Sequence, residues 1–154
     1  MRKLLLILSG GNLNQAAEAA VHEAKQKPDA EIIALYVIDD QVPASVSSWL
    51  IYVGFMGDKP SEDYHHTILK EYRRRALEDL DEVARKIAEA GVACRGRLDE
   101  GPLLETIMRV AEKEQAEMLI MLLPGKSEVG SALYHEAAKS LQKSSPCPVK
   151  IVDR

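Results

Sequence analysis

The stretch Glu117–Val152 reads EMLIMLLPGKSEVGSALYHEAAKSLQKSSPCPVKIV, and it decides the fold of this chain. It starts with a short apolar run typical of a buried strand, continues through a loop with glycine, and reaches a segment with helical composition. Pro146 and Pro148 stop that helix and force an extended chain into a last apolar strand, Val149–Val152. A strand, a loop and a helix N-terminus in this order form the place where α/β proteins usually hold phosphorylated ligands.

The same alternation of strand and helix extends back to the N-terminus. Short apolar runs predict strands at Lys3–Leu8, Glu31–Ile38, Val92–Leu98, Met118–Leu123 and Val149–Val152. Apolar spacings and breaker residues predict helices at Asn14–Lys27, Ser61–Ala90, Pro102–Glu114 and from Gly130 or Ser131 to Lys143, with a turn at Asp99–Pro102. Residues 1–154 are therefore expected to form a single α/β domain. Its fold class is a doubly wound five-stranded parallel sheet of order 3-2-1-4-5, with helices on both faces.

This strand order places a crevice between the first and fourth strands. The winding of the chain reverses there, and ligands of open α/β sheets bind at the carboxyl ends of the strands beside such a point. Ser9-Gly10-Gly11 follows the first strand, and Pro124-Gly125-Lys126 follows the fourth. These two loops are expected to border the crevice.

Composition excludes several classes of protein. A net charge of −4 and a pI near 5.6 argue against nucleic acid as a partner, because phosphate binding needs a positive surface. The apolar run at the start ends at Leu8, is shorter than a secretory core, and has no small-residue cleavage site. No segment is long enough to span a bilayer, so we expect a cytoplasmic protein without membrane contact. Cys94 and Cys147 have no metal-ligand spacing and are expected to be reduced.

The segment Trp49–Met56 is apolar but lies outside the regular pattern of strands and helices. One interpretation is an ordinary loop or short helix folded over the edge of the core. The other is a lid over the crevice or a surface that contacts a protein partner, since exposed apolar patches usually mark contacts.

No set of residues predicts catalysis or a metal centre. His65 and His66 follow two acids, but adjacent helical residues point about 100° apart and cannot share one ion easily. His22 and His135 have no sequence partner for a proton relay, and Ser131 has no surrounding GxSxG elbow. We therefore expect no catalytic and no metal-binding residues.

With these motifs in view, the chain resembles the universal stress protein family over nearly its whole length. The matching stretches are KLLLILSGG, EIIALYVIDD, Asp99-Glu100-Gly101-Pro102, EMLIMLLPGK and SSPCPVKIV. The resemblance implies the adenine nucleotide alpha hydrolase-like fold, a cytoplasmic role in stress response, and a homodimer that pairs through the last strand, Val149–Val152. Some members of the family bind ATP and others do not.

The ATP-binding branch of the family carries a glycine, two residues, a second glycine, nine residues, then glycine followed by serine or threonine. Without gaps, Gly125 takes the second glycine, Leu122 takes the first, and His135-Glu136 takes the final pair. The bulky Leu122 and the carboxylate of Glu136 are unfavourable beside a phosphate. Ser9 stands where the family has an acid after the first strand.

The residues that remain compatible with a nucleotide crevice are Ser9, Gly10, Val37, Gly125, Lys126 and Ser127. A second register, with Gly130-Ser131 as the final pair, requires a deletion of five residues from the loop and a longer helix. We adopt the ungapped register and expect no cofactor, because Leu122, His135 and Glu136 disfavour ATP.

The resemblance and the altered motif together predict a non-enzymatic, dimeric stress-response regulator with an eroded nucleotide crevice. The alternative is an ATP- or AMP-binding universal stress protein with an altered phosphate loop. A third hypothesis, slow phosphohydrolysis, lacks a base or a metal ligand in the sequence.

Overall fold

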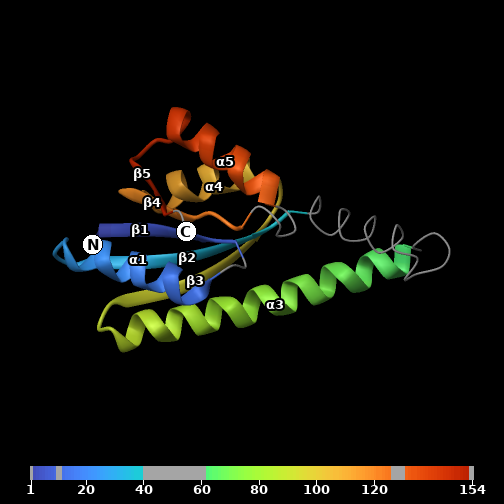
Figure 1. The fold of residues 1–154 in the computed structure, drawn as a ribbon, viewed down its shortest axis with the longest axis horizontal. Helices are drawn as coiled ribbons and strands as arrows, with labels where there is room; N and C mark the ends of the chain where they lie inside the picture. The colour runs from blue at the N-terminus through green and yellow to red at the C-terminus, as the bar shows by residue number, and fades with distance from the viewer. Residues whose placement is uncertain (1, 10–11, 40–61, 126–130, 153–154) are drawn as a thin grey trace.

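All five strands of the computed structural model run parallel in one sheet (Figure 1). The structure describes residues 2–9, 12–39, 62–125 and 131–152. The strands are β1 (Arg2–Leu8), β2 (Ala30–Ile38), β3 (Ala93–Glu100), β4 (Met118–Leu122) and β5 (Val149–Val152). Their order is β3-β2-β1-β4-β5, which confirms the predicted fold class and strand order.

Two layers of helices cover the sheet. The helices described are α1 (Leu13–Lys25), α3 (Glu62–Glu89), α4 (Leu103–Glu114) and α5 (Ser131–Ser144). Helices α1 and α3 lie on one face, and α4 and α5 lie on the other (Figure 1). None of these described helices has a stretch long and apolar enough to cross a lipid bilayer.

Strand β1 contributes side chains to the cores on both faces of the sheet. Its residues Leu4–Leu8 are at most 1% exposed, because β2 and β4 flank the strand and helices cover both of its faces. Leu4, Leu6 and Leu8 belong to the core beneath α1 and α3, while Leu5 and Ile7 belong to the core beneath α4 and α5. A continuous apolar run is the pattern that such a strand requires.

Helix α1 begins at Leu13, one residue before the predicted start at Asn14. The side chain of Asn12 accepts a hydrogen bond of 3.1 Å from the backbone N–H of Gln15, so Asn12 is the N-cap. The buried face of α1 contains the alanines Ala16, Ala17, Ala20 and Ala24. Their small side chains allow the helix to pack closely on the sheet.

The turn before α4 is shorter than the sequence indicated. Asp99 and Glu100 belong to β3, because β2 continues to Ile38 and both residues pair with it in register. The turn is reduced to Gly101 and Pro102, and the N–H of Gly101 donates to the carbonyl of Ile38 at 3.0 Å. Pro102 has an extended ψ of 133°, so it precedes the helix and does not form its first turn.

We predict that Gly101→Ala lowers the free energy of unfolding by about 1–3 kcal/mol, because the backbone conformation and a close contact both disfavour a side chain at this position. The φ of Gly101 is +142°, and an added Cβ would lie 2.8 Å from the Oγ1 of Thr106. Urea unfolding followed by circular dichroism measures the change.

Gly96→Ala is the matched control in the same β3–α4 region. An added Cβ at Gly96 meets Leu80 at 3.5 Å, an ordinary contact distance, and the φ of Gly96 lies outside the left-handed region. Alanine there should leave stability unchanged or raise it by about 0.5–1 kcal/mol, as expected for glycine in a strand. Equal losses in both variants would contradict the role assigned to Gly101.

Candidate functional site

The position predicted for the crevice is the carboxyl end of the sheet, where β1 and β4 end side by side. The two strands are neighbours in the sheet, and Ser9 and Leu122 lie at their ends. The hydroxyl of Ser9 donates a hydrogen bond of 3.1 Å to the carbonyl of Leu122. Ser9, which we expected to face a nucleotide, therefore links the end of β1 to the end of β4.

Leu122 affects the crevice through its carbonyl group. Its side chain is 3% exposed and packs into the core beneath α1 and α3. The bulk that we expected to keep a phosphate away is therefore directed into the core. Val37, near the end of β2, is fully buried in the other core.

Part of the predicted site lies outside the described residues. Gly10, Lys126 and Ser127 fall there, as does the apolar segment Trp49–Met56. Gly125 is described and is partly exposed.

Helix α5 begins at Ser131, which is buried. This start agrees with the predicted helix, and it places His135 one turn inside α5. The Nε2 of His135 lies 3.1 Å from the carbonyl oxygen of Pro124, and Glu136 is exposed. The carboxylate of Glu136 is therefore not at the positive end of the helix, and our argument that it repels an anion there loses its geometric basis.

Three tyrosines from three elements meet at the same end of the sheet. Tyr36 pairs in register with Leu8 at the end of β1, and its ring makes an edge-to-face contact with that of Tyr72 of α3 at a centroid distance of 6.0 Å. The hydroxyls of Tyr36 and Tyr134 lie close enough to that of Tyr72 for each to influence the pKa of its neighbour. We call Tyr36, Tyr72 and Tyr134 the tyrosine cluster.

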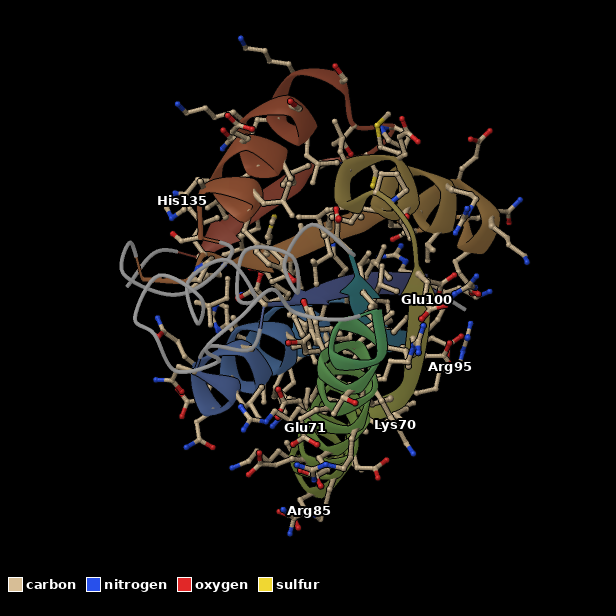
Figure 2. All side chains as sticks on the ribbon, turned by 90° about the vertical axis from the view of Figure 1, so that its right-hand side faces the viewer. Lys70, Glu71, Arg85, Arg95, Glu100 and His135 are labelled. Atoms are coloured by element: carbon tan, nitrogen blue, oxygen red, sulfur yellow. The ribbon has the colours of Figure 1, made fainter. Side chains whose placement is uncertain are left out.

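The tyrosine cluster passes around the end of the sheet. Tyr36 and Tyr72 pack in the core beneath α1 and α3, while Tyr134, the fourth residue of α5, packs in the opposite core. The electrostatic interaction between Tyr72 and Tyr134 therefore acts around the edge where the strands end. Figure 2 faces this edge, with His135 of α5 on one side of the sheet and Lys70 and Glu71 of α3 on the other.

The tyrosines of the cluster are neutral. Burial is the largest cause that raises the pKa of each of the three hydroxyls. The negative charge of Asp39 raises the pKa of Tyr72 and of Tyr134 further. A protonated hydroxyl can both donate and accept a hydrogen bond.

Asp39, directly after β2, is 3% exposed. Its Oδ2 accepts a hydrogen bond of 2.9 Å from the backbone N–H of Leu103, the first residue of α4. Pro102 provides no side-chain cap for that helix, so Asp39 supplies a negative charge and an acceptor at the positive end of α4.

Among the described residues, other reactive side chains form no site. No group of three or more His, Cys, Asp or Glu side chains in this part of the chain is placed to hold a metal ion. Cys94 and Cys147 are free, and burial raises the pKa of the Cys94 thiol to about 11. His22 contacts Gln26 at 2.7 Å, which is an ordinary contact within α1.

Comparison with known proteins identifies the family to which this fold belongs. The model of the universal stress protein family matches residues 1–153. The chain belongs to the universal stress protein family. It is 29% identical to the universal stress protein MJ0531 of Methanocaldococcus jannaschii, over 99% of this chain and 82% of that protein.

Solved structures show the same fold. The protein MJ0577, also of Methanocaldococcus jannaschii, superposes with a TM-score of 0.70 at 21% identity. The superposition covers 99% of this chain and 96% of the MJ0577 chain. A universal stress protein family protein of Arabidopsis thaliana with AMP bound superposes with a TM-score of 0.64 at 15% identity, covering 100% and 92%. A universal stress protein in complex with cAMP gives 0.61 at 15% identity, covering 99% and 96%. The chain has the adenine nucleotide alpha hydrolase-like fold of these proteins.

We predict that the tyrosine cluster resists ionisation at alkaline pH. A free tyrosine ionises near pH 10, and the pKa values of these three hydroxyls are higher in the folded chain. The folded state therefore keeps protons that the unfolded chain releases above about pH 10, so the free energy of unfolding falls as pH rises beyond that point.

Ultraviolet difference absorbance of tyrosinate measures the ionisation, and circular dichroism measures the fold in the same titration. We expect Tyr36, Tyr72 and Tyr134 to ionise together with unfolding. Ionisation of all tyrosines near pH 10 with an intact fold would contradict the burial of the cluster.

Proposed function

We propose that this universal stress protein is a cytoplasmic, non-enzymatic, homodimeric stress-response regulator whose nucleotide crevice is closed by its own side chains. The observation that carries this proposal is the burial of Tyr134, which is 3% exposed and packs in the core at the start of α5. We infer that its aromatic ring takes up space that a nucleotide would need beside the start of α5.

The hydrogen bond between Ser9 and Leu122 further supports a closed crevice, because it joins the ends of the two strands that border it. The Ser9 hydroxyl is used within the chain, and it carries no charge that could bind a metal ion accompanying a triphosphate. In addition, Asp39 places a buried negative charge near the cluster, which disfavours an anionic ligand. These features support a protein without a bound cofactor and without catalysis.

A second candidate function is binding of an adenine nucleotide. It is favoured by the start of α5 at Ser131, the residue that the alternative register places at the phosphate-binding position. Binding of AMP by the Arabidopsis relative and of cAMP by another structural neighbour also favours it. One measurement separates the two candidates.

We expect the purified protein to carry no nucleotide and to bind ATP and AMP more weakly than about 1 mM, corresponding to about −4 kcal/mol. Mass spectrometry of the denatured protein detects a bound nucleotide, and isothermal titration calorimetry measures affinity. A dissociation constant in the low micromolar range for either nucleotide would establish the second candidate instead.

The proposed homodimer is supported by the free edge of β5. Pro148 and Val152 direct their carbonyls to Leu119 and Leu123 on the β4 side. Backbone groups alternate in direction along a strand, so those of Val149 and Ile151 face the open edge. A twofold axis can pair this edge with a second copy of itself.

Ile151→Pro is expected to split the dimer, because it removes an outward N–H without removing a hydrogen bond between β4 and β5. Ile151→Val is the matched control, since it keeps the N–H and a β-branched side chain. Light scattering at tens of micromolar should show a dimer for the unmodified chain and the valine variant, and a monomer for the proline variant. An unmodified chain that is monomeric would refute the dimer.

A further inference from the structure

The edge strand β5 carries one charged residue, and helix α1 neutralises it. Lys150 is the second of the four residues of β5, and its ammonium group donates a hydrogen bond to the carboxylate of Glu23 and forms an ion pair with it. Glu23 is 7% exposed and lies on the face of α1 that is otherwise made of buried alanines. Among the described residues, each of the two has the other as its only ion-pair partner.

Stability of the single chain does not explain this ion pair. A carboxylate as little exposed as that of Glu23 requires a partner, because an unpaired buried charge is costly. However, apolar side chains of similar volume often stabilise a fold as well as a buried ion pair does. The presence of a lysine in β5, with an acid placed to meet it, therefore calls for a reason that lies outside the core of one chain.

The backbone of β5 determines where Lys150 would lie if two such edges paired. The backbone groups of Val149 and Ile151 face the open edge, while those of Lys150 face β4. In an antiparallel pair about a twofold axis, both outward residues form hydrogen bonds within the described strand only when Val149 stands opposite Ile151 of the second copy. Lys150 then stands opposite Lys150 of the second copy, with Cα atoms about 4.5 Å apart and both side chains on the same face.

We infer that Glu23 permits β5 to pair with a second copy of this chain, because it neutralises the lysine that would otherwise face its own copy across the twofold axis. Like charges directly opposite each other destabilise a pair of strands, and a lysine in an edge strand normally prevents pairing. Here each ammonium group is directed to the α1 of its own chain, so the two copies meet as neutral pairs. This inference rests on the proposed homodimer, and it names the side chain that allows that dimer to form.

Glu23→Gln tests the inference, because it keeps the size of the side chain and leaves the charge of Lys150 without a partner. Sedimentation equilibrium should show a dimer dissociation constant raised by about five- to fiftyfold, as expected for two facing charges near a protein surface. Glu18→Gln is the matched control, since it removes a carboxylate from an exposed position of the same helix. Its dissociation constant should equal that of the unmodified chain.

Two further measurements separate repulsion between lysines from damage to α1. The double variant Glu23→Gln with Lys150→Gln carries no charge at either position, and it should dimerise nearly as well as the unmodified chain. Raising the salt concentration from about 0.05 to 0.5 M should strengthen the dimer of Glu23→Gln and leave that of the double variant unchanged, because salt screens repulsion between exposed charges. Circular dichroism checks the fold, and Glu23→Leu, which suits a buried position among alanines, replaces Glu23→Gln if that variant is unfolded.

The outcomes distinguish failure of the inference from failure of the dimer on which it rests. A monomeric unmodified chain overturns the proposed homodimer and the inference together. A dimeric unmodified chain whose dissociation constant is unchanged in folded Glu23→Gln overturns the inference alone. Weakening that neither the second substitution at Lys150 nor added salt reverses also overturns it, because Glu23 would then act only through the packing of α1.

Discussion

The burial of β1 on both faces is the constraint on which the rest of the structure depends. A strand whose residues Leu4–Leu8 are removed from water on both faces needs a helix layer on each side and a strand on each edge. Parallel neighbours require crossover connections, and these bring every carboxyl end to the same edge. The position of the crevice follows from this burial before any functional residue is considered.

The closed crevice that we propose requires side chains that are apolar toward the core and polar toward the edge of the sheet, and tyrosine has both properties. Loops and helix starts at the end of a parallel sheet expose polar backbone groups, so a purely apolar plug would leave them without partners. Tyr134 buries an aromatic ring in the core at the start of α5. Since burial raises the pKa of the hydroxyls of Tyr72 and Tyr134, these side chains carry no charge and avoid the cost of burying one.

The fold could be predicted from the sequence because each strand and helix has a recognisable local pattern of residues. The apolar run of β1, the alanine face of α1 and the prolines around Cys147 each identified their element, and the start of α5 at Ser131 was also predicted. The end of β3 was predicted two residues short, since Asp99 and Glu100 have turn composition and pair only because β2 continues opposite them.

The candidate site was only partly predictable because its members come from three distant elements. Periodicity marked Tyr72 as part of a buried stripe, but no local pattern reports that it meets Tyr36 and Tyr134. Counting along a motif placed His135 and Glu136 at a helix start, whereas the helix begins one turn earlier. Motif spacing measures distance along the chain, and a shorter loop before α5 with a correspondingly longer helix changes that distance while the helix still starts near the end of the sheet. The closed crevice that we propose therefore depends on the side chains at this edge, which the glycine pattern alone does not determine.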